Sequence, residues 1–247
     1  MQVDESQEVK ALREELRAYF AKVMTPEVKE GCHAKESGQV YRDAVRQIGK
    51  DGWLAIGWPK EYGGQGRGQA EQLALLEEAY IAGAPIPFVT LGTVGPALME
   101  HGSEEMKQFY LPKIAGGEIH FAIGYTEPGA GTDLASLTTS AVIEGDELVI
   151  NGTKVFTSGA DNADYIWLAA RTDKDAPKHK GISMIIVPTS AKGFSFAHIK
   201  TVGDVPTCMS YYDNVRVPLT NVVGKLNKGW NLITSQLNHE RVGLAAI

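Results

Sequence analysis

The sequence has little that would mark a secreted, metal-bound or membrane protein. Among its 247 residues only Cys32 and Cys208 are cysteines, and they form no CxxC pair, so we expect neither a disulfide framework nor a metal site. No apolar run approaches the ~20 residues that a membrane-spanning helix needs. The N-terminus, MQVDESQEVK, is polar and acid-containing, unlike a signal or transit peptide. These absences predict a cytoplasmic protein without a membrane span.

Excess positive charge is also missing. The formal net charge is -6, which gives no basic footprint for nucleic acid or for an anionic membrane surface. Hydrophobic residues make up 43% of the chain and charged residues 22%, a globular composition that allows one large core or two modest ones.

The first 118 or so residues are predicted to be helical. One apolar stripe recurs at three- and four-residue steps and closes at Thr25-Pro26; its members are Val9, Leu12, Leu16, Phe20 and Val23. A shorter stripe comprises Tyr41, Val45 and Ile48. A third helix is expected from Gln69 to about Ala82, with Leu73, Leu76 and Tyr80 on its apolar side and Glu71, Glu77 and Glu78 on its wet side. Ser103 is expected to cap a further helix.

From His120 onward the pattern predicts strands. Seven short runs are rich in β-branched and aromatic residues: HFAIGYT, LTTSAVI, ELVINGTKVFTS, DYIWLAAR, GISMIIVP, FSFAHI and SYYDNVRVP. Glu144-Gly145-Asp146 and Asn151-Gly152 are expected to be turns between them. This density of strands favours a compact β-barrel or sandwich.

A helical period returns after Gly224, where Trp230, Ile233, Leu237 and Leu244 share one helix face. We therefore predict an α+β chain in three parts. Residues 1–118 form an N-terminal helical domain, residues 119–228 a β-barrel or sandwich, and residues 229–247 the first helix of an incomplete C-terminal helical domain.

The stretch GYTEPGAGTD, residues 124–133, is the first candidate site. It follows a predicted strand, and its glycines would let the backbone approach a ligand and present N–H groups to phosphate or a polar ring edge. Thr126 and Thr132 add hydroxyl donors. An ordinary type II turn at Pro128-Gly129 explains the same residues equally well.

The stretch KVFTSGADNADYIW, residues 154–167, is the second candidate. Phe156 could stack on a flat cofactor, and Ser158 could hydrogen-bond one of its ring nitrogens. The alternative is a core phenylalanine followed by a turn serine.

Glu240 lies at one edge of the apolar stripe of the last helix. A carboxylate against an apolar face has its charged form disfavoured, which raises its pKa toward the range of a general base. The alternative is that Glu240 and Arg241 border the stripe and reach water, as most ionisable residues do.

Four stretches together resemble the acyl-CoA dehydrogenases, in the family's order. They are GWPKEYGGQG, YTEPGAGTD, NGTKVFTSGADNADYIWLAARTD, and YYDNVRVP followed by LNHERV. The resemblance covers nearly the whole chain. The sequences of these stretches are most similar to those of actinobacterial enzymes of sterol side-chain breakdown. Some of those enzymes are heterotetramers of two different subunits.

The resemblance implies FAD as cofactor and acyl-CoA as substrate. By position, the family's flavin contacts fall on Ile123, Tyr125, Thr126, Gly131, Thr132, Phe156, Thr157 and Ser158. Phe156 stands where many members have Trp, and Ser158 where many have Thr. Thr132, Asn238 and Arg241 fall where members contact the acyl-CoA. Glu240 matches the base of the subset that supplies it from the first C-terminal helix.

The implied reaction forms an α,β-double bond, with the α-proton going to Glu240 and the β-hydride to flavin N5. The implied partners are an electron-transfer flavoprotein and a homo- or heterotetrameric assembly. Two other functions remain open: a non-catalytic subunit of a heteromeric dehydrogenase, and a flavin oxidase or monooxygenase on the same scaffold. Only the start of the family's C-terminal domain is expected in this chain.

Overall fold

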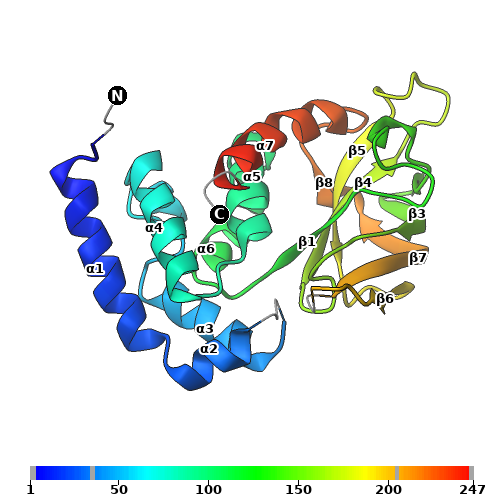
Figure 1. Ribbon diagram of the computed structural model, residues 1–247. Helices are drawn as coiled ribbons and strands as arrows, with labels where there is room; N and C mark the ends of the chain where they lie inside the picture. The colour runs from blue at the N-terminus through cyan, green and yellow to red at the C-terminus, as the bar shows by residue number, and fades with distance from the viewer. Residues whose placement is uncertain (1–3, 34–36, 204–205, 245–247) are drawn as a thin grey trace.

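The computed structural model describes residues 4–33, 37–203 and 206–244, with side chains described up to residue 237. A group of helices lies on one side and a β-sheet on the other, and the last helix runs back from the sheet over the helices (Figure 1). The helices are α1 (Gln7–Val23), α2 (Pro26–Cys32), α3 (Gln39–Lys50), α4 (Gln69–Ala82), α5 (Gly95–His101), α6 (Glu104–Ala115) and α7 (Gly229–Leu244). Short helical turns lie at Lys60–Tyr62, Val89–Val94, Leu134–Ser136 and Leu219–Asn221, of which Val89–Val94 is a π-helix.

Capping side chains explain where three of these helices begin. Ser6 accepts a hydrogen bond from the Val9 amide, and Thr25 accepts one from Val28. The predicted cap at Ser103 is confirmed, because its hydroxyl accepts from the Met106 amide at 3.2 Å. Each bond satisfies one of the amide groups that a helix start leaves unpaired.

The prediction of which α4 residues face solvent is wrong at one apolar and one polar position. The bounds agree with the prediction, yet Tyr80 is 66% exposed while Glu78 is only 2% exposed. Glu78 is buried because α4 packs on α1, where Arg13 and Arg17 bond its carboxylate at 2.8 to 3.1 Å. Two guanidinium groups compensate the cost of burying that charge.

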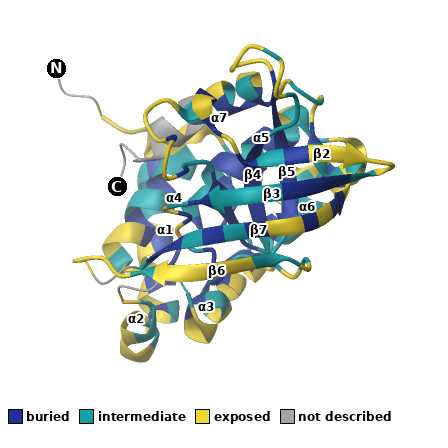
Figure 2. Cartoon of the chain, turned by 90° about the vertical axis from the view of Figure 1, so that its right-hand side faces the viewer, coloured by how far each residue is buried: buried dark blue, intermediate teal, exposed yellow. Residues whose placement is uncertain are grey.

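The strands form one mixed sheet in the order β6-β7-β3-β2-β4-β5-β8, with β1 pairing in parallel beside β4. Their bounds are β1 (Phe121–Gly124), β2 (Ser140–Glu144), β3 (Glu147–Lys154), β4 (Tyr165–Arg171), β5 (Ile182–Pro188), β6 (Phe194–Ile199), β7 (Thr207–Pro218) and β8 (Val222–Val223). All seven predicted runs contain a strand, and β8 was not predicted. Figure 2 shows the exposed edge strand β6 beside the more deeply buried β7 and β3.

One of the two predicted turns is correct. Glu144 pairs with Glu147 across the β2–β3 hairpin, and Gly145 has the positive φ of 65° that a tight hairpin favours. The turn expected at Asn151-Gly152 is wrong, because both residues lie inside β3. The β3–β7 register shifts between Ile150 and Gly152. A Cβ on Gly152 would stand 2.5 Å from Thr139 Oγ1, so the strand needs glycine at this bulge.

Strands β4 and β5 contribute side chains to two hydrophobic cores. Trp167 and Ala169 of β4, with Met184 of β5, belong to the core shared with the helices. Leu168 of β4 and Ile185 of β5 belong to the core on the other face. This alternation is the period of two that a strand imposes.

Candidate functional site

The loop after β1 carries the first predicted segment. Glu127 and Ala130 exchange both backbone hydrogen bonds, at 3.0 and 3.1 Å, so the chain reverses between them. A type II turn is the wrong description, because Gly129 is not among the described glycines with positive φ. A Cβ on Gly129 would meet nothing within 4 Å, and one on Gly131 would meet only a Thr126 methyl at 3.9 Å. The outer side of this loop is therefore open space.

A buried ion pair holds this loop against β3. Lys154 Nζ lies 2.9 Å from Glu127 Oε1 and donates a second bond, also 2.9 Å, to the Tyr125 carbonyl. The Thr138 amide donates to the other carboxylate oxygen, Oε2, at 2.7 Å, and the Thr139 amide donates to Oε1 at 2.8 Å. One pair of side chains thus ties the start of the loop to β3 and to residues 138 and 139.

Both members of the pair are charged at neutral pH. Burial raises the pKa of Glu127, but the Lys154 ammonium and the hydrogen-bond donors outweigh that effect and lower it to about 2. Burial lowers the pKa of Lys154 to about 8, against the opposing pull of Glu127. The geometry of this pair is that of a structural anchor, because Lys154 and Glu127 bond each other and the backbone of neighbouring segments.

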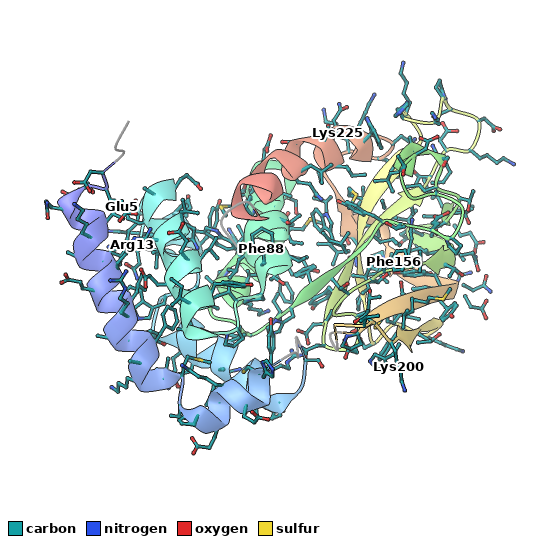
Figure 3. The ribbon with its side chains drawn as sticks, viewed as in Figure 1. Glu5, Arg13, Phe88, Phe156, Lys200 and Lys225 are labelled. Carbon is teal, nitrogen blue, oxygen red and sulfur yellow. The ribbon has the colours of Figure 1, made fainter. Side chains whose placement is uncertain are left out.

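Phe156, two residues after Lys154, differs from its neighbours in both exposure and backbone conformation. The residue is 63% exposed and its backbone has a φ of 60°, a conformation that is uncommon for a residue with a side chain. Figure 3 shows Phe156 at the sheet, at the opposite end of the molecule from Glu5 and Arg13. An exposed aromatic ring on a strained backbone is typical of a ligand-binding position.

The two predicted segments lie side by side. The Val155 amide donates to the Thr126 carbonyl at 2.8 Å, which joins the loop to the residue before Phe156. On the other side, the Ser158 hydroxyl lies 2.9 Å from the Thr207 hydroxyl. Thr157 points inward and is fully buried, with its hydroxyl 3.1 Å from Ser210 Oγ. Of the three residues 156–158, only Phe156 and Ser158 present side chains to solvent.

Ile123 and Thr132 lie at opposite ends of the signature segment. Ile123 is a β1 residue in register with Trp167 of β4, while Thr132 is exposed beyond the turn. Asn238, Glu240 and Arg241 belong to α7 (Gly229–Leu244), but their side chains lie outside the described residues. Their roles stay predictions.

Sequence reasoning missed Gln236, one helical turn before Glu240. Its side-chain oxygen accepts a 2.9 Å hydrogen bond from Trp167 Nε1, and its amide donates to the Tyr125 hydroxyl. The available signal was a glutamine next to the apolar stripe of α7.

The sequence analysis also did not predict a cluster of three potential metal ligands, Asp161, His198 and Cys208. His198 of β6 is in register with Cys208 of β7, and His198 Nε2 lies 3.2 Å from Asp161 Oδ2. The ligand atoms of all three residues lie within 4.8 Å of one another. The residues come from three separate segments, so their spacing in sequence gave no signal. Burial raises the pKa of the Cys208 thiol, which favours the protonated form over a metal-binding thiolate.

An anchored glycine-rich loop beside an exposed aromatic residue is an arrangement expected in a protein that binds a flat cofactor. Family models assign the chain more closely: the acyl-CoA dehydrogenase N-terminal domain matches residues 6–118, and the acyl-CoA dehydrogenase middle domain matches residues 122–215. The chain belongs to the acyl-CoA dehydrogenase family. Members of this family are FAD flavoproteins, as the sequence resemblance implied.

Three relatives show which part of the family is most similar. Acyl-CoA dehydrogenase FadE26 of Mycobacterium tuberculosis is 52% identical over 100% of this chain and 63% of its own. The structure titled "Tcur3481-Tcur3483 steroid ACAD" is 59% identical with a TM-score of 0.95, over 100% of this chain and 64% of that one. The ChsE4-ChsE5 complex from Mycobacterium tuberculosis is 54% identical with a TM-score of 0.90, over 97% and 61%.

These relatives confirm the resemblance to steroid-type members of the family. The chain spans less than two thirds of the length of each of them. None of the helices in the described ranges is long and apolar enough to cross a membrane.

Proposed function

We propose that this chain is part of an FAD-dependent acyl-CoA dehydrogenase that forms an α,β-double bond in an acyl-CoA thioester. The observation that carries the proposal is the pairing of the anchored loop 124–133 with the exposed ring of Phe156. Because one similar structure carries the name "steroid ACAD", we propose a steroid side-chain acyl-CoA, in which the side chain of the steroid forms the thioester, as the substrate class.

The proposed FAD contacts come from the two segments described above. We propose that the cofactor contacts the residues of the two segments, namely Ile123, Tyr125, Thr126, Gly131, Thr132, Phe156, Thr157 and Ser158. Phe156 would cover one face of the ring system, and Ser158 would donate to a ring nitrogen. Thr157 would contribute its backbone only, since its hydroxyl is used inside the sheet. When bound, FAD supplies the acceptor for the hydride of the β-carbon.

Glu240 is the proposed base for the α-proton. If its carboxylate lies against the apolar stripe, as the sequence predicts, the charged form would be disfavoured, which would favour proton abstraction. Thr132, Asn238 and Arg241 are proposed to hold the acyl-CoA. Polarisation of the thioester carbonyl by hydrogen-bond donors would stabilise the charge that develops on its oxygen.

The proposal extends to the organisation of the protein. We propose a helical domain at 1–118, a FAD-contacting sheet domain at 119–228 and the first helix of a further domain from 229. We propose a cytoplasmic oligomer that passes electrons to an electron-transfer flavoprotein. Two similar structures are titled as pairs of proteins, and they support a heteromeric assembly in particular.

The same titles favour a second candidate, a non-catalytic subunit whose partner supplies the working site. The test is anaerobic reduction of the bound flavin by steroid and fatty acyl-CoA thioesters, followed by absorbance. The Glu240→Gln variant should retain FAD, and its rate of flavin reduction should fall by several orders of magnitude. Glu14→Gln, an exposed position on α1, should behave as wild type.

Three outcomes separate the candidates. If Glu240→Gln loses flavin reduction and Glu14→Gln does not, the result supports a dehydrogenase whose catalytic base lies in this chain. Full reduction in Glu240→Gln contradicts that base and favours the non-catalytic subunit. Fast reoxidation of the reduced flavin by oxygen favours an oxidase or monooxygenase on the same scaffold.

A further inference from the structure

Gln236 is a polar side chain in a position where α7 is buried. It is 2% exposed and lies beside the buried Ile233 in the helix. Burying an amide without partners costs free energy, so its presence in a core position calls for specific hydrogen bonds. The side chain has such bonds at both of its ends.

The chemistry of its partners fixes the orientation of the amide. Trp167 Nε1 can only donate, so the atom 2.9 Å away must be the Gln236 oxygen. The amide nitrogen then faces the Tyr125 hydroxyl, whose oxygen accepts. A flipped amide would set two donors against each other at the indole. The arrangement therefore has one orientation.

Both partners are themselves held in place. Trp167 is fully buried in β4, in the core shared by the sheet and the helices. The carbonyl of Tyr125 accepts the bond from Lys154 Nζ, so this residue begins the anchored loop. Gln236 thus connects α7 to a rigid strand on one side and to the predicted flavin loop on the other.

The position of Gln236 along α7 makes this connection relevant to the reaction. Residue 240 follows one turn later, about 6 Å along the axis of the same helix. We propose that Gln236 is a positioning residue, which sets the rotation and height of α7 against loop 124–133 and thereby places the base relative to the flavin. This inference rests on the proposed function above.

A purely structural role predicts a different result. If Gln236 only satisfied the Trp167 indole, its loss would lower stability and leave the rate of flavin reduction unchanged. If it positions the base, a shift of about 1 Å in α7 would reduce the rate by a large factor while FAD stays bound. A slower rate of flavin reduction with unchanged FAD binding therefore distinguishes the positioning role from the structural one.

The experiment compares Gln236→Met with Gln72→Met in the complete flavin-loaded enzyme. Gln72 is a matched control on α4, since its side chain also bridges two groups, the Gly57 amide at 2.9 Å and the Leu54 carbonyl at 3.3 Å. Methionine keeps the length of the side chain and removes the hydrogen bonds. Tyr125→Phe removes the other end of the bridge and keeps the ring.

We expect flavin reduction at saturating acyl-CoA to fall at least tenfold in Gln236→Met, with FAD content and substrate Kd unchanged. Tyr125→Phe should also slow reduction, and the double variant should be no slower than the slower single one, because both remove one interaction. Gln72→Met should reduce at the wild-type rate. A wild-type rate in Gln236→Met, or an equal loss in Gln72→Met, overturns the inference.

Hydrogen exchange tests the connection without turnover. Amides of residues 124–133 and 229–237 should exchange faster in Gln236→Met than in wild type or Gln72→Met, and unchanged exchange overturns the inference. If wild type itself is not reduced by any acyl-CoA, the proposed function fails, whereas the exchange result still decides whether Gln236 ties α7 to the loop.

Discussion

Lys154 and Glu127 form an ion pair of 2.9 Å whose side chains are 0% and 5% exposed. The pair joins the last residue of β3 to the turn of the loop after β1. At pH 7 the Glu127 carboxyl is ionised, because the Lys154 ammonium and the hydrogen-bond donors around it lower its pKa to about 2. The conformation of the predicted flavin loop therefore depends on two side chains that need not touch the flavin.

Lys154→Met should destabilise the protein strongly. Removing one partner leaves the Glu127 carboxylate buried without its counter-charge, which costs about 3–5 kcal/mol. Urea unfolding measures the loss. Lys178→Met is the control, because its ion pair with Asp133 is more than half exposed on both sides and should change stability by about 1 kcal/mol at most. Equal effects of the two variants would contradict the anchoring role.

His120 should make stability depend on pH below neutrality. Burial lowers its pKa from 6.5 to about 4, and Arg42 adds to the effect. Its Nε2 has no hydrogen-bond partner among the described residues. The unfolded chain binds the proton more tightly, so this stability is present above pH 6.5 and is lost as pH falls toward 4.

The matching variant is His120→Phe, which keeps an aromatic ring. Unfolding free energy measured between pH 7 and 4 should fall less steeply in the variant, by up to about 3 kcal/mol over that range. The slope that Glu127 contributes lies lower, between its ordinary pKa of 4.5 and about 2, and should remain. An unchanged slope above pH 4 would show that His120 is not the group responsible.

Phe156→Asn should separate cofactor binding from folding. Asparagine tolerates a positive φ better than phenylalanine, and the ring it replaces is mostly exposed. We expect the stability without FAD to stay within about 1 kcal/mol or to rise, while the FAD content of the purified protein falls. A flavin titration by fluorescence quenching measures the affinity. Unaltered FAD affinity would remove Phe156 from the site.

Local patterns predicted much of the fold. The bounds of α4 and the cap at Ser103 follow from helical period and helix chemistry, and each of the seven strand runs forms a strand. Glu78 was misplaced because its burial depends on Arg13 and Arg17, more than sixty residues earlier. The turn predicted at Asn151-Gly152 was wrong because the glycine is needed where the strand passes close to Thr139, and not for a turn.

The site was predictable only in part. The two segments that meet at Val155 and Thr126 were recognised by their letters, but their contact is a long-range hydrogen bond. The sequence led to no prediction for Lys154 or for Gln236. Both act through partners on other elements, which no local spacing reveals. The domain boundaries and the roles of Asn238, Glu240 and Arg241 stay predictions.

The alternation along β4 and β5 has a consequence for how the protein comes apart. Trp167 and Leu168 are neighbours in one strand, yet each belongs to a different core. Melting either core would pull that strand out of register and open the other core to water. The helical half and the sheet half should therefore lose their structure together, because strands β4 and β5 belong to the cores of both.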